Sequence, residues 1–371
     1  MTFWSPYDMC GLERFSQGST AVFGYGISAG VFDGRRTPRE DNMQKDVFGS
    51  RMLRRIGELS LLVLLIALMA GAAGASDECF PSELDPRYCD RTGDMVADPP
   101  TDPSEWLDPD TLIFTYTPVE DPAIYEEAFS EFLEHLAEKT GKEVRYFPVT
   151  SFSAQLEAMR AERLHIAGFG AGNTINAVNM AGFVPFAIMV QPENVFGYQM
   201  LIITHVDSDI ENLEDLRGRE VAFVSPASNS GYIAPTALLF SELGMKPDID
   251  YSTAFSGLHD NSILGVYNKD YEVAAIAGDI LERMIRRDLV DEDQIKIVYR
   301  SETFPTSSFG YLYNLDPQLA DTIVEAFYSF EWEGTALARE FAPRVAYMPI
   351  TYKEHWEVLR VIRDASDAIG E

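Results

Sequence analysis

Strands and helices alternate along most of this chain. From Leu112 onward, short runs of β-branched and aromatic residues are separated by segments whose apolar residues recur every three or four positions. The first strand is predicted at 112–116, and an amphipathic helix at 123–139 follows it. Consecutive parallel strands need a crossover, which is usually a helix. The alternation therefore predicts an α/β fold whose mostly parallel sheets carry helices on both faces, with ligands at the carboxyl ends of the strands.

The predicted elements divide the chain into two lobes. We expect one lobe to consist of residues 111–203 together with 303–371, and the second to be an insertion of residues 204–302. Residues 76–110 are rich in Pro and Asp, which predicts an N-terminal tail without regular structure. The order is thus lobe, inserted lobe and return to the first lobe.

Residues 52–75 have the pattern of a secretory signal peptide. Arg54 and Arg55 are followed by an apolar run, and the segment closes on small residues that predict cleavage after Ala75. The apolar run is shorter than the roughly 20 residues of a membrane-spanning helix. We interpret Met52 as the start and residues 1–51 as an upstream extension or an untranslated leader, with a genuine extended leader as the alternative. The sequence predicts a periplasmic protein.

Export would allow two of the cysteines to form a disulfide. Cys79 and Cys89 both lie in the part of the chain that follows the predicted cleavage site. An oxidising compartment allows them to pair and to close a short loop in the tail.

Acidic residues outnumber basic ones. The chain has 59 Asp and Glu against 29 Lys and Arg, a formal net charge of −30. Nucleic acids and anionic membranes are therefore improbable partners. The acidic residues are spread along the chain, which indicates a solvated surface and would suit high salt, where the Debye length shrinks to a few Å.

A small polar loop at 225–232 joins a strand to a helix. The strand pattern at 221–224 ends in Ser-Pro-Ala-Ser-Asn-Ser-Gly-Tyr, and a helical pattern follows at once. The first N–H groups of a helix lack intrahelical partners, so Ser228, Asn229, Ser230 and Gly231 are candidates for an anion cradle. A plain N-cap formed by Ser228 or Ser230 is the alternative.

Several segments resemble a known family. Residues 210–224, Ile-Glu-Asn-Leu-Glu-Asp-Leu-Arg-Gly-Arg-Glu-Val-Ala-Phe-Val, resemble the signature that opens the second lobe in type II periplasmic solute-binding proteins. The turns at 228–232 and 257–262 resemble ligand loops of the branch that binds phosphonate, phosphite or phosphate for ABC importers. The resemblance, from about 112 to 348, implies a two-lobed fold with a small anion in the cleft, no cofactor and an ABC transporter permease as partner. We expect a monomer.

The resemblance assigns ligand contacts. It implies an oxyanion loop at Ser228, Ser230 and Gly231, a donating hydroxyl at Tyr198 and a donating imidazole at His259. Tyr198 packed in the core and His259 as a helix cap are the alternatives.

Four further positions follow from the same resemblance. Asp279 matches a carboxylate that receives the ammonium group of aminophosphonates, although it could instead cap a helix at 280–287. Phe152 stands where many members have a tyrosine, and Thr306 and Ser307 stand where aminophosphonate binders place a second acid. Phe152 could simply pack in the core. Thr117 lies in a loop expected at the cleft.

The loops assigned to the cleft contain no Lys or Arg. These are residues 115–122, 191–199, 225–232, 256–262 and 302–308. We therefore expect neutral donors and helix dipoles, without a countercharge, to hold the anion.

Three other functions remain open at this point. Ser230, His259 and Asp279 could form a hydrolytic triad, although the G-x-S-x-G elbow is missing. The same fold could bind sulfonate, nitrate or another small anion, or could act as the sensory subunit of a membrane receptor. No metal-ligand spacing is evident among the histidines.

Overall fold

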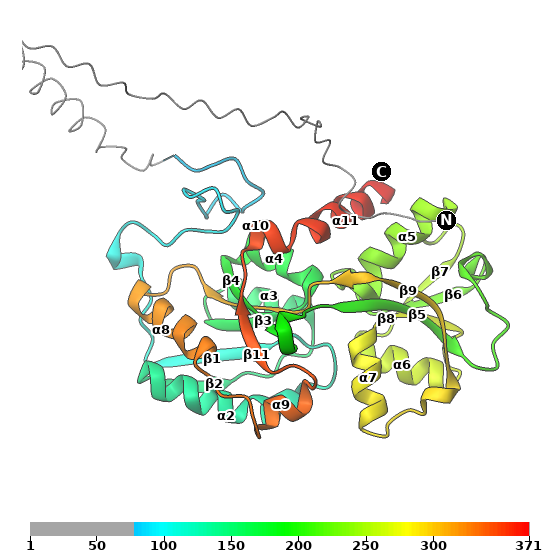
Figure 1. Cartoon of the computed structure of the whole chain (residues 1–371). Helices are drawn as coiled ribbons and strands as arrows, with labels where there is room; N and C mark the ends of the chain where they lie inside the picture. The colour runs from blue at the N-terminus through cyan, green and yellow to red at the C-terminus, as the bar shows by residue number, and fades with distance from the viewer. Residues whose placement is uncertain (1–77, 371) are drawn as a thin grey trace, which may run out of the picture. The chain divides into compact units, whose positions relative to one another are not determined.

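Two β-sheets, each flanked by helices, organise the chain (Figure 1). The computed structural model describes residues 78–370. The predicted extension at 1–51 and the signal peptide at 52–75 lie outside the described residues. We call the six-stranded sheet with its helices lobe 1 and the five-stranded sheet with its helices lobe 2.

Lobe 1 contains six strands in the order β11-β4-β10-β3-β1-β2. They are β1 (Thr111–Tyr116), β2 (Glu143–Tyr146), β3 (Ile166–Phe169), β4 (Phe183–Val190), β10 (Ser308–Leu312) and β11 (Ala346–Pro349). Its helices are α2 (Pro122–Thr140), α3 (Phe152–Arg160), α4 (Ala171–Ala181), α8 (Pro317–Tyr328), α9 (Ala336–Glu340), α10 (Tyr352–His355) and α11 (Glu357–Asp367).

Lobe 2 contains five strands in the order β7-β6-β8-β5-β9. They are β5 (Tyr198–His205), β6 (Glu220–Phe223), β7 (Ser252–Phe255), β8 (Val273–Ala277) and β9 (Ile295–Phe304). Its helices are η4 (Asn229–Ile233), which continues into α5 (Ala234–Leu243), and α6 (His259–Tyr267) and α7 (Gly278–Arg286). Short 3-10 turns complete the chain at Pro103–Glu105, Pro192–Asn194, Leu213–Leu216, Glu292–Gln294 and Ala368–Gly370.

Both sheets are mixed, whereas the sequence predicted mostly parallel ones. The pairs β1–β2, β1–β3, β6–β7 and β6–β8 are parallel, as the helical crossovers require. The strands next to the connections between the lobes pair antiparallel: β10 lies between β3 and β4, and β5 lies between β8 and β9. The α/β fold class is confirmed, and the difference arises where the chain crosses between lobes.

The sheet of lobe 2 is buried on both faces because its side chains alternate. Leu201, Ile203 and Ile276 pack on one face with α6 and α7. Ile202 and Ala275 pack on the opposite face with residues of β6 and α5. This period of two is what a strand imposes.

The chain passes between the lobes at residues 191–197 and 305–307. β5 and β9 belong to the second sheet over their full lengths. The second sheet therefore begins at Tyr198 and ends at Phe304, beyond the expected lobe limits of 204 and 302. Gly197, with φ +118°, sits in the first connection, where a Cβ would lie 2.2 Å from the Cγ2 of Thr303.

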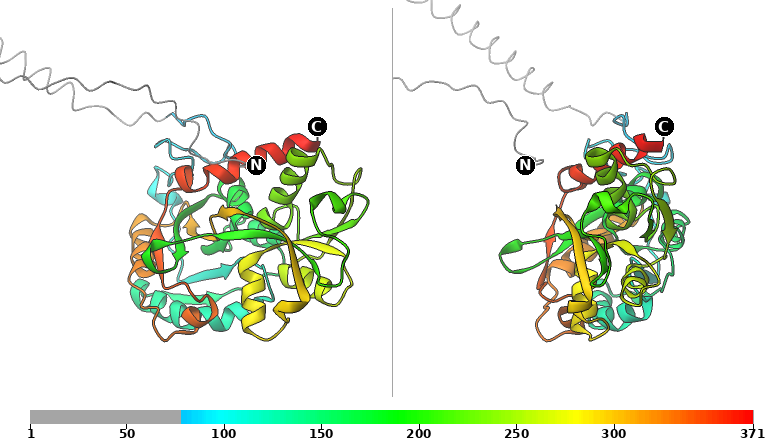
Figure 2. Two further views of the ribbon diagram at one scale, coloured as in Figure 1. Left: turned by 45° about the vertical axis from the view of Figure 1, so that its right-hand side comes forward. Right: turned by 90° about the vertical axis from the view of Figure 1, so that its right-hand side faces the viewer.

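The C-terminal helix contacts both lobes. This C-terminal helical segment is divided at Trp356 into α10 and α11. From α11, Arg363 donates to Asn176 of α4 (2.5 Å), and Ser366 is 3.2 Å from Thr236 of α5. Figures 1 and 2 show α11 running from α4 towards α5. The fully buried indole of Trp356 donates to the carbonyl of Ala171 at 2.9 Å.

The tail of residues 78–110 is irregular apart from one 3-10 turn. A disulfide joins Cys79 and Cys89. The tail is tied to lobe 1 by the backbone N–H of Asp85, which donates to Asn179 of α4.

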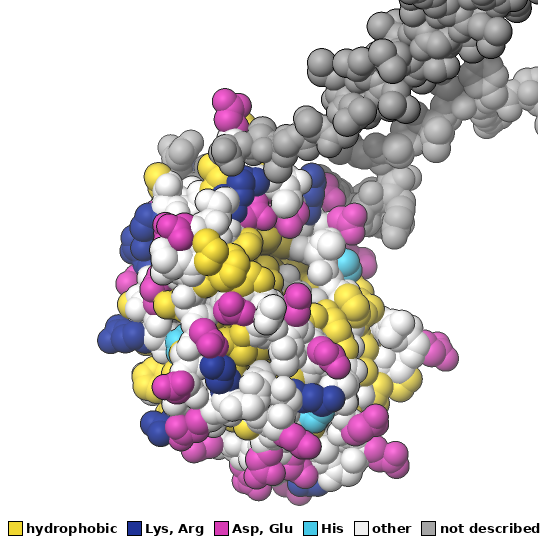
Figure 3. Space-filling view, turned by 90° about the vertical axis from the view of Figure 1, so that its left-hand side faces the viewer, with side chains coloured by type: hydrophobic (Ala, Val, Ile, Leu, Met, Phe, Trp, Pro, Cys, Tyr) yellow, Lys and Arg dark blue, Asp and Glu magenta, His cyan; other side chains and the backbone are white. Residues whose placement is uncertain are grey.

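Acidic side chains are spread over the face in Figure 3, with Lys and Arg between them. No helix within residues 78–370 has both the length and the apolar content for a membrane crossing.

Candidate functional site

A small cavity lies between the two lobes. Its volume is about 50 Å³, which accommodates a few water-sized groups. The lobes touch at its rim, where the His259 N–H of lobe 2 donates to the Val119 carbonyl of lobe 1 at 3.0 Å. Eight of the ten predicted ligand residues line it: Phe152, Tyr198, Ser228, Asn229, Ser230, His259, Asp279 and Ser307.

Four helices begin at this cavity. They are α4 at Gly170–Asn173, η4 at Ser228, α6 at His259 and α7 at Gly278. The first N–H groups of each helix lie at the positive end of its dipole, so the four starts favour an anion. Gly172 lets α4 approach the loop before η4 closely, because a Cβ at this position would lie 2.7 Å from the Ala227 carbonyl oxygen across the cleft.

Tyr198 and Asn229 present their polar groups to the cavity together. The Asn229 Nδ2 donates to the Tyr198 hydroxyl at 3.0 Å, which leaves the hydroxyl proton available to another acceptor. Burial raises the pKa of Tyr198 to about 12, so the hydroxyl stays protonated. The ring packs beside Phe304 while the hydroxyl reaches the cavity, so core packing and a polar role coexist.

His259 is held in one tautomer. Its Nδ1 accepts from the Ala277 N–H at 3.1 Å, so in the neutral ring the proton is on Nε2. The Nε2 lies 3.3 Å from the Ser228 Oγ, which also accepts from the Gly231 N–H at 3.1 Å. Burial lowers the pKa of His259 to about 4, which keeps the ring neutral and Nε2 a donor. The alternative of His259 as a helix cap is wrong, because Leu258 is the N-cap of α6 and no side chain caps this helix.

The geometry contradicts a hydrolytic triad. A triad needs the acid on the Nδ1–H of the histidine and the nucleophile at Nε2. Here a backbone N–H occupies Nδ1, and Nε2 faces Ser228 instead of Ser230. His259 therefore has no carboxylate to orient it as a base.

Two predicted residues do not line the cavity. Gly231 uses its N–H on Ser228, and a Cβ there would lie 2.5 Å from Val224, so this glycine permits tight packing behind the loop. Thr117 is fully buried beside Gly170, one step from the cavity. Phe152 is buried and also lines the cavity, at the start of α3.

Two arginines line the cavity, although the loops assigned to the cleft contain no Lys or Arg. Arg283 of α7 and Arg344, which precedes β11, both contact Asp279 Oδ2, at 3.4 and 3.0 Å. Neither arginine lies in those loops, so the loop sequences alone do not reveal them. The alternative role of Asp279 as a helix N-cap is wrong, since Ala277 is the N-cap of α7. Burial alone would raise the pKa of Asp279, but the charges of Arg344 and Arg283 outweigh it and lower this pKa.

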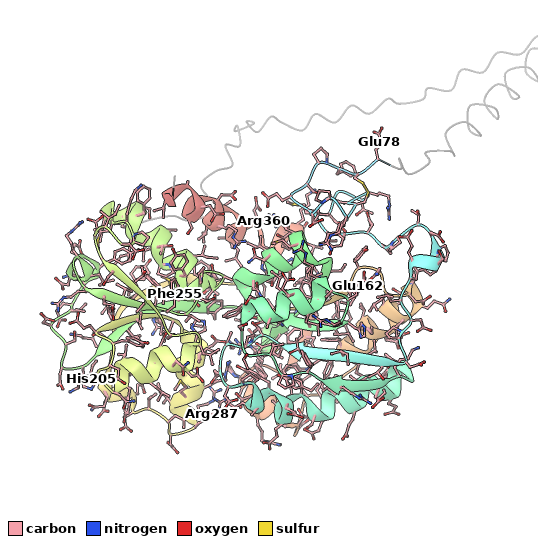
Figure 4. All side chains as sticks on the ribbon, turned by 180° about the vertical axis from the view of Figure 1, so that it is seen from behind. Glu78, Glu162, His205, Phe255, Arg287 and Arg360 are labelled. Carbon is pink, nitrogen blue, oxygen red and sulfur yellow. A yellow bond between two sulfur atoms is a disulfide. The ribbon has the colours of Figure 1, made fainter. Side chains whose placement is uncertain are left out.

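Behind the cavity, these residues belong to an ion network that joins the lobes. Arg283 contacts Glu120 at 2.6 Å and Glu340 at 3.4 Å, and Arg287 contacts the same two acids. Arg287 is labelled in Figure 4, where α7 faces lobe 1. Glu120, Glu340 and Arg344 come from lobe 1, while Asp279, Arg283 and Arg287 come from lobe 2. We call these six residues the interlobe ion network.

Three further neutral residues line the cavity, of which the sequence indicated only Thr306. Tyr116, at the end of β1, donates to Ser307 at 3.1 Å and adds a hydroxyl beside Phe152. Asn173 Nδ2 and Thr306 Oγ1 are buried without a hydrogen-bond partner. Asn173 lies in the first turn of α4, which begins at Ala171, and reaches the cavity. Buried donors of this kind are normally paired, so both are available to a ligand.

The described residues contain no candidate metal site. Within 78–370, no three His, Cys, Asp or Glu side chains are placed to hold an ion.

Comparison with known sequences gives matches over most of the described chain. Residues 114–356 match a family described as the periplasmic substrate-binding protein of phosphonate ABC transporters. The phosphate-import protein PhnD of Mycolicibacterium smegmatis is 29% identical over 246 residues, 61% of this chain and 75% of that protein. The phosphonates-binding periplasmic protein of Escherichia coli is 25% identical over 206 residues, 54% of this chain and 61% of that protein.

Solved structures share the fold. A binding protein of a phosphonate ABC transporter from Pseudomonas aeruginosa superposes with a TM-score of 0.65 at 21% identity, covering 71% of this chain and 88% of that one. PhnD1 of Prochlorococcus marinus, in complex with methylphosphonate, superposes with a TM-score of 0.62 at 14% identity, covering 70% and 99%. These similarities confirm the two-lobed type II fold.

Proposed function

This chain belongs to the family of periplasmic substrate-binding proteins of phosphonate ABC transporters, and from this premise we propose that it captures a small phosphorus oxyanion for an ABC importer. The family is one of binding proteins, located outside the cytoplasm, that deliver a small ligand to a permease. Relatives named for phosphate import and for phosphonate binding support the choice of ligand class.

The observation that carries the proposal is the convergence of neutral donors from both lobes. Lobe 2 contributes Tyr198, His259 and the loop at Ser228–Ser230. Lobe 1 contributes the unpaired amide of Asn173, and the connection between the lobes contributes the unpaired hydroxyl of Thr306. Hydrogen bonds to a charged acceptor contribute about 1.5–3 kcal/mol each, so five or six donors support micromolar or tighter binding after ordering costs.

Calorimetric titration of the purified protein tests this function. Phosphate, phosphite and methylphosphonate are the probes, and methanesulfonate and nitrate are the controls. We expect at least one phosphorus oxyanion to bind with micromolar or tighter affinity and the controls to bind at least tenfold more weakly. Tighter binding of either control, or no binding of any phosphorus oxyanion, would contradict the proposal.

Three finer statements belong to the same proposal. We propose that the exported protein begins after Ala75, that it is monomeric and that its lobes move relative to each other at residues 191–197 and 305–307. N-terminal sequencing of the exported protein checks the first. Light scattering checks the second, and small-angle scattering with and without ligand checks the third.

A further inference from the structure

Asp279 is an acidic side chain in the wall of a cavity proposed to hold an anion. Among the described residues that line the cavity, it is the only acid. A carboxylate in such a wall repels the ligand or receives a positive group of the ligand, unless the protein itself supplies the opposite charge. Which of these holds determines the charge that the ligand's substituent can carry.

The protein supplies the opposite charge from the other lobe. Arg344 Nη2 lies 3.0 Å from Asp279 Oδ2, and only 8% of the Arg344 side chain is exposed. Arg344 belongs to lobe 1 and Asp279 to lobe 2, so the pair forms across the cleft, at the cavity. An ammonium group that sought Asp279 would have to displace a buried guanidinium.

Arg283 does not fill this role by itself. It lies 3.4 Å from the same carboxylate oxygen, but it holds Glu120 at 2.6 Å and Glu340 at 3.4 Å on its other side. Its charge is therefore largely matched behind the cavity. Arg344 is the cation that offsets Asp279.

We propose that Arg344 is a specificity-determining residue that masks Asp279 and restricts the ligand to phosphorus oxyanions without a cationic substituent. This inference rests on the proposed function and names its substrate class: inorganic phosphate, phosphite or an alkylphosphonate, and not an aminophosphonate. A ligand of this class meets no uncompensated acid in the cavity wall. An aminated ligand meets no free carboxylate.

Calorimetry with methylphosphonate and 2-aminoethylphosphonate tests the inference. We expect the purified protein to bind methylphosphonate at least tenfold more tightly. Arg344→Gln uncovers the carboxylate, so the ratio of the two affinities should move at least tenfold towards the aminated ligand. Arg344→Lys keeps the charge and should keep the ratio within about threefold of the original. An unchanged ratio in Arg344→Gln would overturn the inference.

A double variant distinguishes masking from direct contact with the ligand. In Arg344→Gln/Asp279→Asn both charges are gone, so binding of methylphosphonate should return to within about fivefold of the unaltered protein. If Arg344 instead touches the anion, the double variant stays as weak as the single one, and masking is overturned.

Asp279→Asn provides a second route if Arg344→Gln does not fold. A masked carboxylate predicts that this variant loses no more affinity for 2-aminoethylphosphonate than for methylphosphonate. A selective loss of tenfold or more for the aminated ligand would mean that Asp279 receives its ammonium group, and would overturn the inference.

Titration of the unaltered protein distinguishes a failure of the proposed function from a failure of this inference. If none of phosphate, phosphite and the two phosphonates binds, the proposed function is overturned, and this inference with it. Tighter binding of 2-aminoethylphosphonate than of methylphosphonate overturns the inference alone and leaves the proposed function in place.

Discussion

The cavity has two unlike walls. One, the neutral wall, consists of Tyr198, Ser228, Asn229, Ser230 and His259, which carry donors and no charge. The other, the ionic wall, consists of Asp279, Arg283 and Arg344, which continue into the interlobe ion network. The neutral wall has groups left over for a ligand, whereas the ionic wall satisfies its charges within the protein. From the proposals above, we expect the neutral wall to supply affinity and the ionic wall to supply stability and selectivity.

We expect the largest effect from removing a charge behind the ionic wall. Glu120 is 1% exposed and accepts from Arg283, Arg287 and Tyr125. Glu120→Gln leaves two arginines short of a partner and should lower the free energy of unfolding by about 3–5 kcal/mol, measured by urea denaturation.

A matched control is Glu211→Gln, which removes an exposed pair with Lys296 and should change the same quantity by less than about 1 kcal/mol. Equal, small effects of both substitutions would mean that the ion network behind the ionic wall does not stabilise the fold.

The second test uses pH on the neutral wall. The folded-state pKa of His259, about 4, lies below its unfolded value of about 6.5, so the unfolded chain takes up the proton first as the pH falls. His259 therefore contributes full stability above pH 6.5, and this is lost as the pH falls towards 4, by on the order of 3 kcal/mol.

Urea denaturation at pH 7 and at pH 4.5 measures this loss. His259→Asn, whose amide oxygen can replace the Nδ1 acceptor, should lose less stability over the same interval. An identical loss in both proteins would exclude His259 as the cause.

The third test removes single donors from the neutral wall. Tyr198→Phe and Ser230→Ala should each weaken ligand binding by about 1–3 kcal/mol, roughly 5- to 150-fold, because a charged acceptor loses a donor. The control Tyr267→Phe removes an exposed hydroxyl that bonds Asp291. Unchanged affinity in both site variants, as in the control, would show that the ligand lies elsewhere.

The smallest expected effect concerns a group that belongs to neither wall. Thr306 Oγ1 is buried and unpaired, so Thr306→Val should weaken ligand binding by about 1 kcal/mol while the ligand-free protein unfolds no more easily. Calorimetry and denaturation of the same sample measure both quantities. Weaker binding accompanied by an equal loss of stability would indicate a packing defect instead of a lost donor.

The two walls also differ in how far the sequence predicts them. The neutral wall depends on local signals: Ser228 to Ser230 are contiguous before a helix, and Tyr198 opens a strand. The ionic wall is part of the interlobe ion network, which joins positions up to 224 residues apart: Glu120 contacts Arg283, and Arg344 contacts Asp279. Only the Asp279–Arg283 pair, four residues apart on one helix, could have been found from spacing.

The fold shows the same division. Local patterns predicted β1 and α2 to within one residue of their bounds, at 112–116 and 123–139. The antiparallel insertion of β10 between β3 and β4 depends on the return of the chain from lobe 2, which no local pattern encodes.

Trp356 gives the molecule an internal optical reporter. Its indole N–H donates a hydrogen bond to the carbonyl of Ala171, a residue that lines the cavity, and the ring is buried. Any displacement of the start of α4 when the cavity fills alters the surroundings of this chromophore. Capture of the ligand can therefore be followed through intrinsic fluorescence, without a dye or a label.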